Sequence, residues 1–123
     1  VFVAGFIGSP AMNLLKGRVE DGGFRAEGGV VLPLPPGSRA EAGRAALYGV
    51  RPEHLALAGD GVPLRVSVVE PTGAETQILG RLGDQEVVCL LRERIRAQPG
   101  EVLGVRPDPA QAHLFDAATG ARL

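Results

Sequence analysis

Glycine and proline divide this sequence into short apolar runs, and this feature limits its possible folds more than any other. The chain has 123 residues, of which 18 are glycine and 10 are proline. Asp21-Gly22-Gly23, Gly28-Gly29 and Gly83-Asp84 each separate two apolar runs. These residue types accept the positive φ angles of tight hairpin turns. The pattern predicts many short strands joined by turns.

The expected strands make the chain mainly β. Val66 and Val68 alternate with polar or solvent-side neighbours, which predicts that both side chains face the core. Pro33 follows the third apolar run and confines it to a sheet edge, because proline cannot donate to a strand ladder. The strands are expected at residues 14–20, 24–27, 30–32, 48–51, 54–58, 64–69, 76–82, 86–92, 102–106 and 113–115. Eight or more strands predict a small barrel or sandwich.

Two segments favour a helix. Residues 1–7 are apolar and precede a Gly-Ser-Pro stop signal at residues 8–10, which predicts the last turns of a helix that packs on something outside this sequence. Ser38 and Glu41 have the spacing of a capping box, which predicts a short helix over residues 42–47. An irregular exposed loop is an equal alternative for that segment.

The charge balance argues against several classes of function. With 13 basic and 14 acidic residues the net charge is −1, and no basic stripe indicates nucleic acid or an anionic membrane as a partner. A phosphate-binding loop needs lysine followed by serine or threonine, but the single lysine, Lys16, precedes Gly17. The longest apolar stretch falls far short of the ~20 residues that span a bilayer. We therefore expect a soluble chain that does not hydrolyse a nucleotide through such a loop.

The residues that usually carry chemistry are few and scattered. Cys89, His54 and His113 lie far apart and lack the paired spacing of zinc ligands. Cys89 stands in an apolar run, where burial is expected to raise the pKa of its thiol and leave it unreactive. Glu70 and Glu75 bracket a turn, and a catalytic pair there would need a pocket to shift a pKa. We expect no catalytic residue, no metal site and no bound cofactor in this chain.

One short motif occurs twice. Residues 49–52 and 104–107 both read Gly-Val-Arg-Pro, and each copy is followed by an acid, Glu53 or Asp108. Two copies are too few for a repeat array, but they suit a barrel built from similar halves.

Four segments, taken together and in order, resemble one family. They are FVAGFIGSPAMN at residues 2–13, GVRPEHL at 49–55, VEPTGAET at 69–76 and HLFDAATG at 113–120. The first resembles the junction after the nucleotide-binding domain in ATP-binding subunits of sugar and glycerol-phosphate ABC importers, the maltose-transporter type. The others resemble that family's G-[IV]-R-P-E-H, V-E-P-x-G-x-E-T and H-L-F-D-x-x-T-G motifs.

The resemblance implies a TOBE domain (transport-associated OB domain). The implied fold is a mainly β, small OB-like (TOBE/MOP-like) barrel or sandwich with a short N-terminal helix left from the ATPase domain. Residues 1–12 would be the end of the nucleotide-binding domain and a linker, and residues 13–123 the TOBE domain. The implied role is regulation and dimerisation without catalysis, with ATP and Mg bound in an ATPase domain outside this chain.

The resemblance also implies partners, a location and candidate sites. The expected partners are a second copy of the subunit, the transmembrane permease subunits, and a regulatory protein or small effector. The subunit would lie in the cytoplasm, peripheral to the inner face of the membrane. Retention for folding is the alternative explanation of the motifs. The candidate interface or regulatory residues are Gly49, Arg51, Pro52, Glu53, His54, Glu70 and Glu75.

Two other functions fit a small barrel. An oxyanion-binding module of the molybdate type would need hydroxyl groups gathered at one place, for which Ser67, Thr72 and Thr76 are the nearby candidates. An OB-fold nucleic-acid binder would need aromatic platforms and a basic groove, against which stand the four phenylalanines, the single tyrosine and the slightly negative charge.

Overall fold

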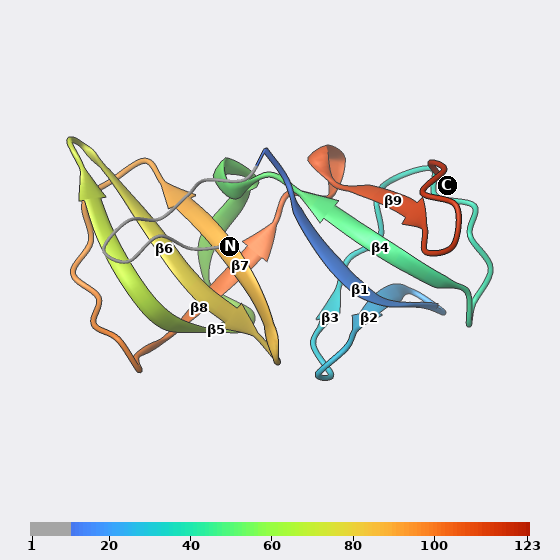
Figure 1. Cartoon of the computed structure of the whole chain (residues 1–123), viewed down its shortest axis with the longest axis horizontal. Helices are drawn as coiled ribbons and strands as arrows, with labels where there is room; N and C mark the ends of the chain where they lie inside the picture. The colour runs from blue at the N-terminus through green and yellow to red at the C-terminus, as the bar shows by residue number, and fades with distance from the viewer. Residues whose placement is uncertain (1–10) are drawn as a thin grey trace.

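The computed structural model describes residues 11–123, and the regular secondary structure of this part of the chain is almost entirely β. It forms two antiparallel sheets with strand orders β3-β2-β1-β4-β9 and β7-β6-β5-β8. The sheets lie side by side, and two short 3-10 helices lie between them at the top of Figure 1. The elements are β1 (Asn13–Glu20), β2 (Gly23–Ala26), β3 (Val31–Leu32), β4 (Ala45–Val50), η1 (Pro52–His54), β5 (Leu55–Thr72), β6 (Glu75–Leu82), β7 (Gln85–Leu91), β8 (Val102–Pro107), η2 (Pro109–Gln111) and β9 (His113–Asp116).

Glycine forms the hairpin turns where the sequence predicts them. Gly22 has φ 85° between β1 and β2, and Gly83 has φ 63° between β6 and β7. A side chain is strained at such angles, so glycine is the favoured residue at both turns. The prolines after β3 also act as expected, because β3 is an edge strand.

One core joins the inner faces of both sheets. Phe24 and Tyr48 come from the first sheet, with ring centroids 5.2 Å apart, and both are fully buried. The Tyr48 hydroxyl donates to the Pro33 carbonyl oxygen at 2.8 Å, which satisfies its polar group, and burial raises its pKa. The second sheet contributes, among others, Leu64, Val66, Ile78, Leu82, Val87 and Cys89.

A bulge in β5 changes which side chains reach this core. Leu64 and Val66 are buried, but Val68 is 40% exposed. The pairing of β5 with β6 shifts between Val66 and Val68, so an extra residue enters the strand there. Beyond the bulge Val69, not Val68, packs against the core. The prediction that Val68 faces inward is therefore wrong, whereas that for Val66 is confirmed.

The two helical expectations have different outcomes. The helix predicted over residues 42–47 is wrong, because β4 begins at Ala45, and the alternative of an irregular loop holds only up to Arg44. Ala46 and Tyr48 are buried between β1 and β9, so long-range pairing overrides the local helix signal. The helix expected at residues 1–7 lies outside the described residues. Between residues 11 and 123, no helix is long and apolar enough to cross a membrane.

Side-chain amides join the two sheets. The buried Asn13 on β1 donates from Nδ2 to the Val88 carbonyl oxygen and accepts from the Val88 amide, both at 2.8 Å. Gln85 on β7 accepts from the Lys16 amide at 2.7 Å and donates to the Lys16 carbonyl oxygen at 2.9 Å. Each side-chain amide therefore bonds to the backbone N–H and C=O of one residue in the other sheet, as a neighbouring strand would. These bonds satisfy backbone groups that the strand ladders leave open.

Candidate functional site

The two Gly-Val-Arg-Pro motifs meet between the two sheets (Figure 1). One motif ends β4 and the other ends β8, and each leads into a 3-10 helix that begins with proline. The Asp108 amide donates to the His54 carbonyl oxygen at 2.9 Å and so links the two segments. The Asp108 carboxylate caps η2 by accepting from the Ala110 amide at 3.1 Å. The sequence echo therefore corresponds to two neighbouring turns of similar form.

Gly49 lies where neighbouring side chains leave no room for a side chain of its own. It pairs with Leu14 on one side and with His113 on the other. A Cβ atom at this position would lie 2.5 Å from Met12 Sδ and 2.9 Å from Phe115 Cε2. Alanine at this position would displace both side chains. Glycine is therefore needed for their close packing across β4.

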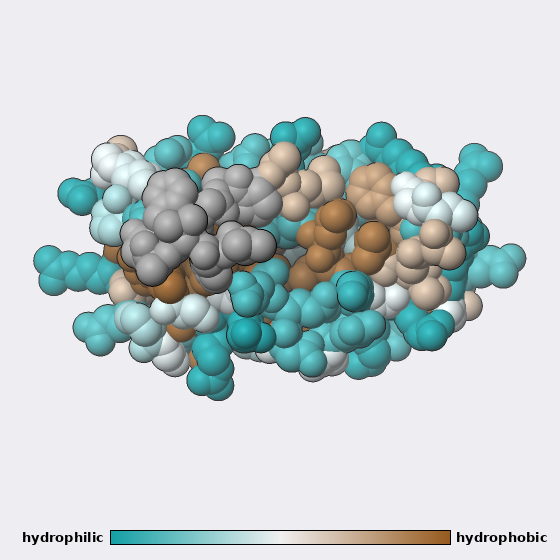
Figure 2. All heavy atoms as spheres, in the orientation of Figure 1, coloured by the Kyte–Doolittle hydropathy of each residue, from teal (hydrophilic) through white to brown (hydrophobic). Residues whose placement is uncertain are grey.

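The side chains around Gly49 form an apolar area on the outer face of the first sheet. We call it the Gly49 face and define it by Met12, Leu14, Leu47, Gly49 and Phe115. Leu14 is 54% exposed, and Met12, Leu47 and Phe115 are half-buried. Figure 2 shows apolar atoms gathered over β1 and β4 in this region. An exposed apolar area of this kind is typical of a protein contact surface.

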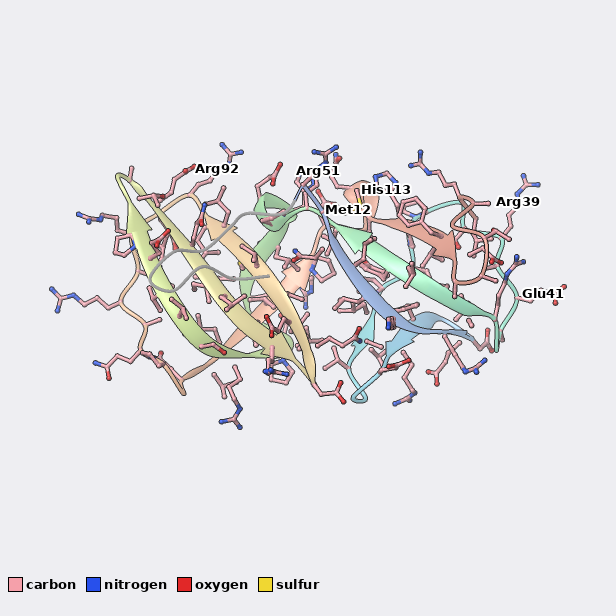
Figure 3. All side chains as sticks on the ribbon, in the orientation of Figure 1. Met12, Arg39, Glu41, Arg51, Arg92 and His113 are labelled. Carbon is pink, nitrogen blue, oxygen red and sulfur yellow. The ribbon has the colours of Figure 1, made fainter. Side chains whose placement is uncertain are left out.

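The other residues of the motif have distinct environments. Arg51 is exposed and extended, with φ −71° and ψ 151°, as expected before proline, and Pro52 is buried at the start of η1. Glu53 and His54 are half-buried, and no ion pair to Glu53 occurs within the described part of the chain. Figure 3 shows Arg51 and His113 along the same edge of the molecule. The structure thus brings the motif beside the His-Leu-Phe-Asp segment.

Glu70 and Glu75 belong to a different hairpin, formed by β5 and β6 in the second sheet. Glu70 pairs with Gln77, and Glu75 pairs with Thr72, so both carboxylates lie on the outer face of that sheet. Neither makes an ion pair or a side-chain hydrogen bond to another described residue. This arrangement matches solvated charges beside a turn.

The hydroxyl groups suggested for an oxyanion site do not converge. Ser67 and Thr72 are exposed. Thr76 is buried, and its hydroxyl donates to the Glu93 carbonyl oxygen at 2.9 Å and accepts from the Ile95 amide at 3.3 Å. Its hydrogen-bonding capacity is used within the fold, so these three residues do not build an anion site.

Cys89 is enclosed by the core. Burial raises the pKa of its thiol to about 12, and the thiol contacts the Leu55 carbonyl oxygen at 3.5 Å. The expected burial is confirmed. No group of three or more metal-ligating side chains is close enough to hold a metal ion in the described range 11–123.

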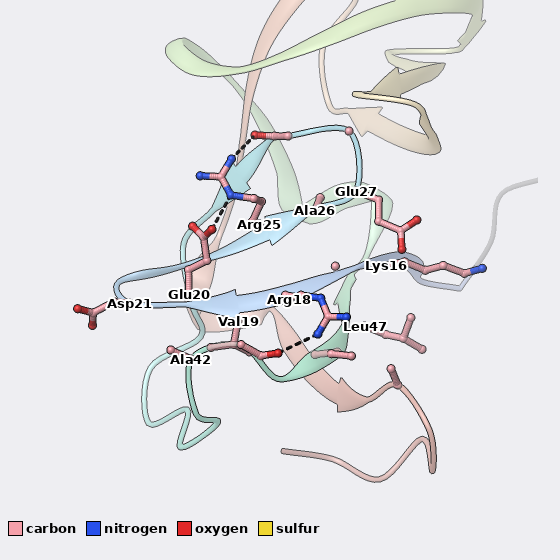
Figure 4. Close-up of a pocket in the computed structure, with 17 residues that line it drawn as sticks. Lys16, Arg18, Val19, Glu20, Asp21, Arg25, Ala26, Glu27, Ala42 and Leu47 are labelled. Atoms are coloured by element: carbon pink, nitrogen blue, oxygen red, sulfur yellow. Dashed lines mark hydrogen bonds and ion pairs between the residues drawn. The ribbon is translucent and has the colours of Figure 1, made fainter.

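An open hollow of about 870 Å³ lies over β1, β2 and the start of β4. Figure 4 shows its charged lining. Arg25 donates from Nε to Glu20 Oε1 at 2.5 Å, and Arg18 donates from Nη1 to the Gly43 carbonyl oxygen at 2.9 Å. Basic and acidic groups therefore neutralise each other here. The hollow presents no concentrated charge for a ligand.

Sequence reasoning missed the contacts of two residues and misread a third. Asn13 joins the sheets, and the only sequence signal for it is its place at the end of the FVAGFIGSPAMN segment. Arg122 contacts the His113 ring although nine residues separate them. Ser38, read as a helix cap, has a buried hydroxyl instead.

Comparison with known proteins identifies the class of this fold. Residues 8–55 match the model of the MalK OB fold domain, and residues 48–115 match that of the TOBE domain. The molybdate-bound structure of the cytoplasmic molybdate-binding protein ModG superposes with a TM-score of 0.67, at 16% identity over 85% of this chain and 95% of that one. At this identity the similarity concerns the fold alone. The fold is thus mainly β and OB-like, built from two antiparallel sheets.

The chain belongs to the TOBE domain family. It is 46% identical over 126 residues to the uncharacterized ABC transporter ATP-binding protein y4oS of Sinorhizobium fredii (strain NBRC 101917 / NGR234), covering 100% of this chain and 34% of that protein. It is 47% identical over 128 residues to the sn-glycerol-3-phosphate import ATP-binding protein UgpC of Shigella sonnei (strain Ss046), covering 100% of this chain and 36% of that protein. The chain thus spans about a third of the length of these relatives.

Proposed function

We propose that this chain is the non-catalytic regulatory and dimerisation domain of the ATP-binding subunit of an ABC importer. One observation carries the proposal: relatives 46–47% identical along the whole chain are named ATP-binding proteins of such transporters. A sugar or a related solute such as a glycerol phosphate would be the cargo. ATP and Mg would be bound by the part of the subunit that this chain does not include.

The remaining parts of the proposal follow from this assignment. The subunit would act in the cytoplasm, peripheral to the inner face of the membrane and bound to the permease subunits. The boundary between a linker at residues 1–12 and the domain at residues 13–123 stays a prediction. The roles of Gly49, Arg51, Pro52, Glu53, His54, Glu70 and Glu75 in an interface or in regulation stay predictions as well.

The Gly49 face supports a role in dimerisation. It is apolar, and more than half of the surface of Leu14 is exposed. The net charge of −1 gives little long-range repulsion between two copies. We assign this face to a second copy of the same domain, because a two-fold contact between identical patches is the commonest way in which soluble proteins pair.

The assignment predicts that the purified 123-residue chain neither binds nor hydrolyses ATP. Its single lysine lies on β1 in an exposed strand position, not in a phosphate-binding loop. Isothermal titration calorimetry with MgATP should show no saturable heat, whereas the complete gene product should bind the nucleotide. Saturable ATP binding by the 123-residue chain would contradict the proposal that the nucleotide is bound outside this chain.

A further inference from the structure

A second cleft, beside the Gly49 face and apart from the hollow over β1 and β2, has a lining suited to an anion. It has a volume of about 340 Å³ and lies between the loop at residues 35–38, the helix η2 and the end of the chain. Ser38, His113 and Arg122 line it, and no aspartate or glutamate does. We propose that this cleft binds a small oxyanion of the phosphate class, either inorganic phosphate or the phosphate group of a monoester.

The basic groups around the cleft lack acidic partners. Arg122 donates from Nη2 to His113 Nδ1, which leaves the other ring nitrogen of His113 as a donor. No ion pair to Arg51 or Arg122 occurs among residues 11–123, although four other arginines are paired with acids there. An unpaired guanidinium in a cleft is the group best suited to bind a phosphate by two parallel hydrogen bonds.

The two carboxylates nearest to His113 in the sequence form hydrogen bonds with other groups. Asp108 caps η2. Asp116 accepts from Arg44 at 2.6 Å and from the amides of Ala118 and Thr119 at 2.8 Å each. Burial lowers the pKa of His113, and the positive charges of Arg122, Arg51 and His54 lower it further. The charges that shift the pKa of this ring are thus those of basic groups.

Ser38 provides an independent indication that this cleft binds a ligand. Its hydroxyl oxygen is buried without a hydrogen-bond partner in the described structure. A buried hydroxyl in that state is costly, and native structures rarely retain one without a reason. Ser38 lines the cleft, and a rotation about its Cα–Cβ bond would offer the hydroxyl to an acceptor there. A bound oxyanion would supply that acceptor.

Calorimetric titration of the 123-residue chain with inorganic phosphate, at constant ionic strength, tests the proposal. We expect saturable binding that Arg122→Gln weakens by about tenfold or more, since charge-assisted hydrogen bonds are lost. Arg25→Gln is the matched control, because Arg25 is already paired with Glu20 on another face, and it should leave the affinity unchanged. Absence of saturable binding, or equal loss in the two arginine variants, would overturn the proposal.

Ser38→Ala separates a ligand-binding role from a structural one. Removing an unsatisfied hydroxyl should leave the melting temperature of the free chain equal or higher, while phosphate affinity falls roughly three- to tenfold. A lower melting temperature with unchanged affinity would show that Ser38 serves the fold alone and would remove this support.

Parallel titrations identify the source of the phosphate group. Tighter binding of sn-glycerol 3-phosphate than of inorganic phosphate would assign the cleft to an ester, whose carbon end would meet the prolines at residues 35 and 36. The reverse order would assign it to the free ion. Either result supports the site, and neither depends on the importer assignment. If molybdate alone binds, the phosphate-class proposal fails.

Discussion

Cys89 shows how a single buried group makes the stability of this domain depend on pH. Its side chain is fully buried in the core, where it contacts the carbonyl oxygen of Leu55. Burial disfavours the thiolate and raises the pKa to about 12, whereas an exposed thiol titrates near 8.5. The unfolded chain therefore loses this proton at a lower pH than the folded chain does.

This difference predicts a loss of stability at alkaline pH. Between about pH 8.5 and 10 the unfolded state is stabilised by ionisation, so the free energy of unfolding should fall, approaching about 1.4 kcal/mol per pH unit. Urea unfolding at pH 7, 8, 9 and 10 measures it, and Cys89→Ala should give a flatter profile. Tyr48, whose pKa is also raised by burial, contributes near pH 10 in both proteins, so the difference between their profiles reports Cys89 alone. Equal slopes in the two proteins would contradict the assignment to Cys89.

At the scale of the strand, the bulge in β5 decides which substitutions the sheet tolerates. Val66 is 2% exposed and Val68 is 40% exposed, although only one residue separates them. A strand of regular period would place both on one face, but the register shift rotates the second out of the core.

We predict opposite outcomes for aspartate at these two positions. Val66→Asp should unfold the domain, because it buries a charge without a partner. Val68→Asp should change the free energy of unfolding by about 1 kcal/mol or less, because its side chain reaches solvent. Circular dichroism melts of the two variants measure the contrast. Similar melting of both variants would show that the bulge is misplaced.

The side-chain amides of Asn13 and Gln85 form hydrogen bonds between the two sheets, and single substitutions test how much these bonds stabilise the fold. Asn13→Ala leaves the Val88 amide and carbonyl unpaired in a buried place, which should cost about 2–4 kcal/mol. Gln85→Ala, the matched control, opens bonds at an exposed position where water can replace them, and should cost about 1 kcal/mol or less. Urea denaturation of both variants gives the comparison. If the two costs are equal, the Asn13 bonds do not hold the sheets together.

At the scale of the whole molecule, we predict that the domain self-associates through the Gly49 face. Leu14→Asp should make it monomeric without unfolding it, because Leu14 is 54% exposed. Val31→Asp is the control, since Val31 is a comparably exposed valine on the edge strand β3. Analytical ultracentrifugation measures the change.

A second variant separates this contact from the apolar segment at the start of the chain. Deleting residues 1–8 removes Val1, Phe2, Val3, Phe6 and Ile7. If the shortened chain still dimerises, the barrel supplies the contact. If it is monomeric at every accessible concentration, the barrel alone does not supply the dimer affinity.

The local features of this fold could be predicted from the sequence. Asp21-Gly22-Gly23 and Gly83-Asp84 become hairpin turns, and most strands lie within a few residues of their predicted ranges. The strands predicted separately at 54–58 and 64–69 are instead one continuous strand, β5. The burial of Cys89 follows from its apolar neighbours.

The sequence by itself determined the turns, the strands and the family, because these depend on residues that are neighbours in the chain. Only the tertiary structure decided the face of Val68, the strand at residues 45–47, the Asn13–Val88 junction and the clustering of His113 with Arg122 and Arg51. Asn13 and Val88 are 75 positions apart. A contact over such a distance leaves no periodic signal in the sequence, since it depends on how two sheets pack and not on the preferences of either strand.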